Sequence, residues 1–142
     1  MFRPILSVAL LSLIVTGCQS TAAAPCAATQ AVVEAVAGLN ADILRLTVHA
    51  TPPDGGELQA IASTAPEKLG KPSDAEDLRA IDEGMAVDLD EGSDIDVTVP
   101  ILKKDGAYTA AVGVTMKGGG DRQKIIAAAK MIAAEVETRL QK

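Results

Sequence analysis

Aromatic residues are nearly missing from this chain of 142 residues, which has no Trp, one Phe and one Tyr. Phe2 belongs to an N-terminal apolar segment, so Tyr108 is the only aromatic side chain in the remainder. Ala and Val must therefore supply much of the core. We expect any cavity to be modest and lined by aliphatic groups and short hydroxyls.

Histidine is equally scarce, because His49 is the only one. A single histidine excludes a zinc site built from several histidines. A triad with Ser63 and a carboxylate is disfavoured, since neither a G-x-S-x-G elbow nor oxyanion glycines accompany Ser63. We therefore predict no enzymatic activity and no cofactor, and we interpret His49 as a strand residue that faces solvent.

Basic residues are in deficit, with 13 Lys and Arg against 19 Asp and Glu, for a net charge of −6. Of these charged residues only Arg3 lies within residues 1–17, so the rest of the chain has 12 basic and 19 acidic residues, a net charge of −7. Negative charge of this size argues against binding to nucleic acid or to anionic lipid surfaces.

Long apolar runs are lacking too, because the run from Ile5 to Val15 is too short to span a bilayer with ease. Arg3 precedes this run and small residues separate it from Cys18, which is the pattern of a secretory signal over residues 1–17. No later run is long and apolar enough to span a membrane.

The end of that segment, Val15-Thr16-Gly17-Cys18, resembles the bacterial lipobox, in which the cysteine is acylated and becomes the new N-terminus. The resemblance implies a membrane anchor on Cys18, where each buried CH₂ contributes about 0.8 kcal/mol. By resemblance to bacterial sorting rules, Gln19 implies the periplasmic face of the outer membrane. The alternative is an ordinary signal peptide cleaved after Ala22-Ala23-Ala24, with Cys18 lost.

Residues 18–29 are rich in Ala, Ser, Thr and Pro without an apolar period, and we interpret them as a tether. They contain Cys26, a lone thiol that we interpret as unused, because neither a Cys-x-x-Cys pair nor a neighbouring base accompanies it. If Cys18 is not acylated, a Cys18–Cys26 disulfide becomes the alternative.

Residues 30–142 carry the patterns of one folded domain. Apolar residues at steps of three and four predict helices, strict alternation predicts strands, and clusters such as TPPDGG at 51–56 predict the turns between them. Strands joined by hairpins with helices set apart indicate an α+β fold, an antiparallel sheet of about five strands with N- and C-terminal helices packed on it. The predicted helices span 30–42, 73–83 and 121–140, and the predicted strands span 44–49, 57–62, 85–90, 95–101 and 108–116.

The other predicted elements are arranged around the crossover that connects the second strand to the middle helix. We expect Ser73 to cap this helix, with Glu76 completing a capping box and Gly84 ending it. Ser63 and Thr64 end the preceding strand, where a polar group could face a cavity under the crossover. The alternative is that their hydroxyls only satisfy backbone groups at the end of the strand.

Three segments resemble extracytoplasmic Cache, or PDC, sensor domains, which are relatives of the PAS fold. AIASTAPEKLGK at 60–71 is similar to their "apolar strand, Ser, then D/N-P-x-x-hydrophobic-G-K" segment. VTVPI at 97–101 resembles a strand that ends in proline before a turn, and 106–114, with Gly113 inside, resembles their closing strand. The resemblance implies a sensing module whose pocket lies on the sheet under the crossover. The Tyr, Trp and Arg cluster of amino-acid-binding members has no counterpart here.

The acidic run of residues 88–96 has enough carboxylates to suggest Ca²⁺, but Gly92 comes one place too early for an EF-hand and no bidentate Glu follows. We interpret the run as a solvated hairpin tip and predict no metal site.

The sequence thus predicts a lipid-anchored, non-catalytic module of the periplasm that binds a small ligand or an envelope protein partner. The candidate ligand-binding residues are Ser63, Thr64 and Tyr108. The alternative is an accessory envelope lipoprotein with no ligand pocket, kept as a structural or interaction unit.

Overall fold

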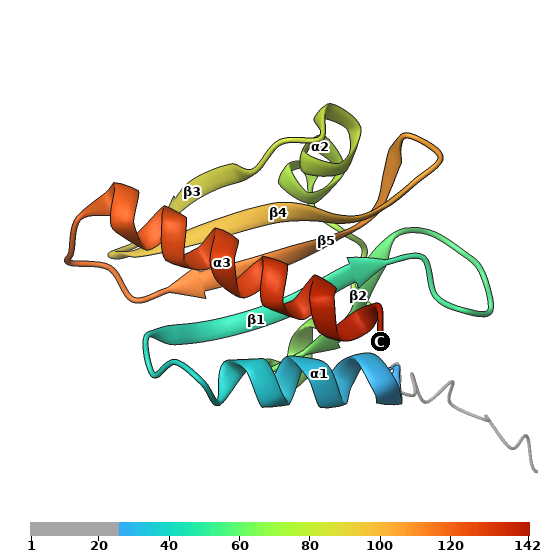
Figure 1. Cartoon of the computed structure of the whole chain (residues 1–142), viewed down its shortest axis with the longest axis horizontal. Coiled ribbons are helices and arrows are strands. Elements are labelled where there is room, and N and C mark those ends of the chain that lie inside the picture. The colour runs from blue at the N-terminus through green and yellow to red at the C-terminus, as the bar shows by residue number, and fades with distance from the viewer. Residues whose placement is uncertain (1–25) are drawn as a thin grey trace, which may run out of the picture.

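The computed structural model describes residues 26–142, which form one antiparallel sheet with helices on both of its faces (Figure 1). The described elements follow the predicted order of one helix, two strands, a helix, three strands and a final helix. They are α1 (Ala27–Ala37), β1 (Ile43–Ala50), β2 (Gln59–Ser63), the 3₁₀ turn η1 (Pro66–Lys68), α2 (Ala75–Glu83), β3 (Val87–Glu91), β4 (Asp94–Lys104), β5 (Ala107–Met116) and α3 (Arg122–Leu140).

The five strands are arranged in the order β2-β1-β5-β4-β3, and every neighbouring pair is antiparallel. The last strand, β5, therefore occupies the centre, between β1 and β4. In this register Gly113 of β5 lies opposite Thr47 on one side and Thr98 on the other. The prediction of an α+β fold with a five-stranded antiparallel sheet is confirmed.

One face of the sheet is apolar and is covered by α1 and α3 (Figure 1). Alternation along the strands directs Leu46, Val97 and Val112 into this layer, where each is at most 1% exposed. From α3 the layer receives the small residues Ala129 and Ala133, which let the helix lie close to the strands. Burying one Val or Leu side chain stabilises the fold by about 1.5–3 kcal/mol, so this layer is the main source of stability.

The opposite face of the sheet is polar and lies under η1 and α2. Asp74 is the N-cap of α2 and forms a reciprocal capping box with Asp77, in which Asp77 Oδ2 accepts the backbone N–H of Asp74 at 2.9 Å. The prediction that Ser73 and Glu76 form this box is wrong by one residue, because Asp caps a helix as well as Ser does. Gly84 ends the helix in the left-handed conformation, as predicted.

The outer edge of β2 is covered along its length. The side-chain amide of Gln30 pairs with the backbone of Ser63 in both directions, at 2.9 and 3.0 Å, as a further strand would. Nearer the other end, Ala60 donates to Lys71 and accepts from Gly70 in the crossover. This edge strand therefore leaves few unpaired backbone groups.

The first helix begins at Ala27, three residues before the predicted start, and Cys26 stands at its N-cap position. The Thr29 hydroxyl donates to Cys26 Sγ at 3.4 Å, and this hydrogen bond lowers the pKa of the thiol. The sequence interpretation of residues 26–29 as tether is therefore wrong. The predicted signal segment and the lipid on Cys18 lie outside the described residues and stay predictions.

Within residues 26–142, every helix is too short or too polar to cross a membrane.

Candidate functional site

A cleft of about 570 Å³ opens between the polar face of the sheet and the crossover that runs through η1 into α2. Its position agrees with the pocket that the sequence resemblance implied. The floor comes from the strands and the roof from the crossover and the first turn of α2. The lining residues are Arg45, Thr47, His49, Ala60, Lys68, Lys71, Pro72, Ser73, Asp74, Glu76, Asp77, Glu91, Asp96 and Gly113.

Gly113 makes the middle of the floor flat. A Cβ at this position would lie 3.8 Å from His49 Nε2, which is an ordinary van der Waals distance, and no other heavy atom would lie within 4 Å. Gly113 does not have a positive φ, so the backbone itself does not demand glycine here. The missing side chain thus leaves space beside the imidazole, where an occupant of the cleft can lie against the sheet.

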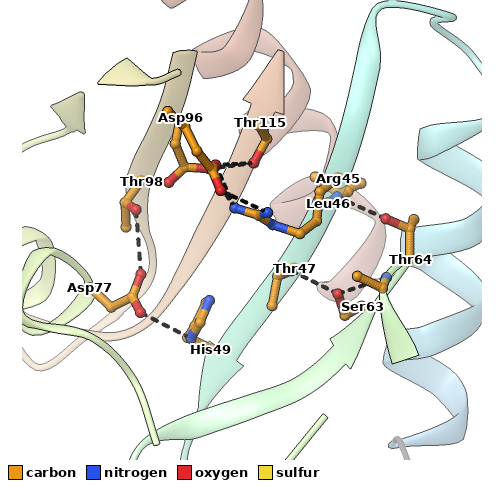
Figure 2. Close-up of polar contacts among 12 residues, drawn as sticks. Arg45, Leu46, Thr47, His49, Ser63, Thr64, Asp77, Asp96, Thr98 and Thr115 are labelled. Atoms are coloured by element: carbon orange, nitrogen blue, oxygen red, sulfur yellow. Dashed lines mark hydrogen bonds and ion pairs between the residues drawn. The ribbon is translucent and has the colours of Figure 1, made fainter. Parts of the chain in front are cut away.

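His49 connects the floor to the roof. Its Nδ1 lies 3.2 Å from Asp77 Oδ2 (Figure 2). The same atom lies 3.0 Å from Ser73 Oγ. The side chain is only 14% exposed, so the prediction that His49 faces solvent is wrong. The prediction failed because the alternating pattern places His49 on the non-core face of the sheet but cannot show that the crossover covers this face.

Burial controls the charges of this pair. Desolvation lowers the pKa of His49, against the attraction of Asp77, and desolvation raises the pKa of Asp77, against the attraction of His49. Asp77 Oδ1 accepts a hydrogen bond from the Thr98 hydroxyl at 3.3 Å, which, together with the Asp74 N–H, satisfies the carboxylate. A neutral imidazole is the form favoured by burial, and its Nδ1–H then donates to Asp77.

That arrangement leaves Nε2 of His49 as a hydrogen-bond acceptor. No group among residues 26–142 makes a hydrogen bond with Nε2, and the atom does not count among the buried polar atoms that lack a partner. Nε2 is therefore open to the cleft. The dyad of Asp77 and His49 presents a fixed, uncharged acceptor beside the space above Gly113.

Arg45 closes the other end of the cleft. It binds both carboxylate oxygens of Glu91, at 3.1 and 2.8 Å. It also lies 3.5 Å from Asp96 (Figure 2). Asp96 in turn accepts a hydrogen bond from the Thr115 hydroxyl at 2.6 Å. The hydrogen bond with Arg45 lowers the pKa of Glu91.

The acidic run of residues 88–96 is divided between two arginines. Glu91 and Asp96 bind Arg45 at the cleft, whereas Asp88 and Asp90 bind Arg122 at the start of α3. In the part of the chain that the structure describes, no cluster of three or more His, Cys, Asp or Glu side chains could hold a metal ion. The run therefore serves ion pairs rather than a solvated hairpin tip alone.

The three candidate ligand-binding residues do not lie together. Ser63 is 1% exposed, and its Oγ lies 2.8 Å from Thr47 Oγ1 and accepts the Ala65 N–H at 3.1 Å. Thr64 Oγ1 accepts the Leu46 N–H at 3.0 Å. These contacts match the alternative in which hydroxyls satisfy groups at the strand exit, and neither residue lines the cleft.

Tyr108 lies elsewhere, beside the C-terminal end of α2. It lines a second hollow of about 390 Å³ with residues that include Gly84 and Lys103, and the Lys103 ammonium sits 5.4 Å from the ring centroid. A role for Ser63, Thr64 or Tyr108 in ligand binding stays a prediction.

Sequence reasoning did not select Arg45, His49 or Asp77 as binding residues. A signal was present in β1, where Arg45, Thr47 and His49 alternate with Leu44, Leu46 and Val48, which shows that one face of the strand is polar. Asp77 gave no such signal, because in sequence it is one of many acidic residues near the start of a helix.

Comparison with solved structures finds GAF domains. The GAF domain of an Acinetobacter phosphoenolpyruvate-protein phosphotransferase matches with a TM-score of 0.52 at 15% identity, over 77% of each chain. The GAF domain region of a Geobacter sulfurreducens PCA protein matches with a TM-score of 0.56 at 8% identity, over 79% of this chain and 89% of that one. No family model and no curated protein matches the sequence.

At such low identity the likeness defines the fold alone: the chain has a GAF-like fold. The assignment to Cache sensors is therefore wrong. The segment at 60–71 that suggested it encodes the end of β2, the turn η1 and a left-handed Gly70. These are local features that different antiparallel folds can share, so they could not distinguish one fold from the other.

Proposed function

We propose that this chain is a regulatory module of the GAF-like class that binds a small ligand in the cleft between sheet and crossover. The fold is one used by small-ligand-binding regulatory modules, and this chain has a cleft at the polar face of its sheet. The observation that carries the proposal is the open Nε2 of His49 beside Gly113, because an oriented polar atom that faces a cleft, over a floor without a side chain, is typical of a ligand site.

The geometry of His49 supports binding without catalysis. In a serine triad the base receives the serine proton on one ring nitrogen and is oriented by a carboxylate on the other. Here Ser73 and Asp77 both contact Nδ1, so Ser73 is not placed to lose its proton to the imidazole while Asp77 orients it. The dyad holds an acceptor in place and does not activate a hydroxyl of this chain.

Filling the cleft from its floor tests the proposal. Gly113→Leu places a side chain in the space beside His49, whereas Thr109→Leu, on an exposed position of the same strand, adds a similar side chain outside the cleft. A metabolite library is screened by thermal shift with wild type, because a ligand that binds only the folded state raises stability by RT ln(1 + [L]/Kd).

We expect compounds that stabilise the wild type to stabilise Thr109→Leu equally and to lose their effect on Gly113→Leu. Shifts that persist in Gly113→Leu would place the binding elsewhere and contradict the proposal. A library without effect on wild type, with a protein partner recovered by crosslinking, would favour a structural or interaction unit.

A further inference from the structure

The roof of the cleft holds two lysines in one tight turn. Lys71 donates its backbone N–H to the Lys68 carbonyl at 3.1 Å, and Gly70 takes the left-handed conformation that this turn needs. Backbone hydrogen bonds from Ala60 to Lys71 and from Gly70 to Ala60, at 3.1 and 2.9 Å, fasten the turn to β2. The two ammonium groups therefore extend from a rigid base next to the sheet.

Some of the charged side chains that line the cleft have an ion-pair partner and others do not. Arg45 is paired with Glu91 and Asp96, and His49 is paired with Asp77. Lys68 and Lys71 form no ion pair with any residue in 26–142, although both line the cleft. On the α2 side, Asp74 caps the helix and Glu76 carries the remaining carboxylate. The cations without a partner are thus on the crossover, whereas the carboxylates of the cleft are on α2, where Asp77 pairs with His49, and on β3 and β4, where Glu91 and Asp96 pair with Arg45.

Lys68 lines the same cleft as His49 and Glu91. Burial is the main cause that lowers the pKa of His49, and the hydrogen bond with Arg45 is the main cause that lowers the pKa of Glu91; the charge of Lys68 adds a smaller effect in the same direction on each. Thr47 and Gly113, which lie opposite each other on β1 and β5, line this cleft too, and Gly113 leaves its part of the floor without a side chain. A molecule that entered here would meet a cation above, a flat floor below, and the acceptor Nε2 of His49 at its side.

Resting on the proposed function, we propose that the ligand is a small anion with a hydroxyl or amine group. Lys68 and Lys71 hold its anionic oxygens, and His49 Nε2 accepts a hydrogen bond from its hydroxyl or N–H. An ammonium is a strong donor to carboxylate or phosphate, and charge-assisted hydrogen bonds are about twice as strong as neutral ones. The neutral acceptor at His49 adds selectivity, because an occupant that cannot donate leaves Nε2 desolvated without a partner.

A matched set of probes tests each part on the full chain. Glycerol 3-phosphate carries both the anion and hydroxyl donors, glycerate replaces the phosphate by a carboxylate, and inorganic phosphate lacks the carbon-bound hydroxyls. Glycerol lacks the charge, and choline reverses it. Each is titrated at millimolar concentration by amide NMR and calorimetry, with the imidazole resonances of His49 as a direct report on the cleft.

We expect glycerol 3-phosphate or glycerate to shift the signals of His49 and Gly113 and to bind about tenfold or more tightly than glycerol or choline. In the double variant Lys68→Ala/Lys71→Ala, the anions should bind no more tightly than glycerol or choline. The control Lys103→Ala/Lys104→Ala removes the same amount of charge from the β4–β5 hairpin, outside the cleft. We expect this control to bind the anions as tightly as wild type does. His49→Phe reduces the preference for glycerol 3-phosphate over inorganic phosphate.

Three results overturn the inference. Glycerol or choline binding in the cleft as tightly as the anions would show that the ligand is not anionic, while still supporting a ligand site. Equal affinities for the two double variants would show that Lys68 and Lys71 do not hold the anion. Failure of every probe to shift any cleft signal would overturn this inference alone, because the library screen with Gly113→Leu tests the proposed function separately.

Discussion

The two faces of the sheet come from the same strands, but one face is apolar and the other is polar. Leu46 and Val48 point from β1 into the apolar layer under α1 and α3, while Arg45, Thr47 and His49 point from the same strand into the cleft. The apolar face carries a core of almost fully buried side chains, whereas on the polar face the groups are joined by hydrogen bonds and leave space above Gly113. Stability is concentrated on one face, which allows the other to keep a hollow.

The largest expected effect is on the apolar face. Leu46→Ala removes a fully buried side chain and should reduce the free energy of unfolding by about 2–5 kcal/mol, because a cavity remains. Thr47→Ala, one residue further along, loses the hydrogen bond with Ser63 and should cost about 1 kcal/mol. Urea unfolding followed by circular dichroism measures both. Equal losses would mean that the two faces contribute alike and would contradict the comparison.

An intermediate effect is expected at Asp77, which serves both the helix and the cleft. Asp77→Ala removes the acceptor for the Asp74 N–H and should cost about 1–2 kcal/mol, while Asp77→Asn keeps an acceptor and should cost less. Both variants remove the negative charge beside His49, so the pKa of the imidazole should fall further below its usual value. NMR titration gives this pKa without ambiguity, because the chain has one histidine.

The pH dependence of stability follows from the same pair. The folded state holds the pKa of His49 below the unfolded value of 6.5, so below about pH 6.5 the unfolded chain binds more protons at this site. Wild type should therefore lose stability relative to His49→Gln as the pH falls from 7 through that range. A wild type that gained stability relative to His49→Gln would show that Asp77 raises the pKa more than burial lowers it.

The smallest effect is expected at the Arg45–Glu91 pair, whose side chains are 24% and 47% exposed. Exposed ion pairs contribute about 0.2–1 kcal/mol and weaken with salt. A double-mutant cycle with Arg45→Gln and Glu91→Gln, at low and high salt, measures the coupling. A coupling energy well above 1 kcal/mol at high salt would mean that this end of the cleft is a structural part of the fold.

Much of the fold followed from local patterns in the sequence. The alternation of Ala110, Val112 and Val114 gave the central strand, and the apolar stripe of α3 gave the long terminal helix. The cap of α2 was misplaced by one residue, because Ser73 and Asp74 are both good caps and the choice depends on the hydrogen bond between Ser73 and His49. That contact joins residues 24 positions apart and has no local signature.

The site was harder to predict for the same reason. Its parts come from β1, the crossover, α2 and the three C-terminal strands, and they converge only after the sheet has formed. Ser63 and Thr64 were chosen because their position at a strand end is visible in sequence, yet their hydroxyls are used within the fold. The identity of the fold as GAF-like rather than Cache depends on the arrangement of the whole sheet, which short motifs do not encode.

The covered edge of β2 has a consequence for how this protein meets other chains. With Gln30 and the crossover already paired to β2, an incoming extended peptide finds few unpaired backbone groups at that edge. The opposite edge, β3, carries Asp88 and Asp90, whose carboxylates already bind Arg122 of the same chain. Strand addition at the β2 edge is thus hindered by hydrogen bonds that the chain makes within itself.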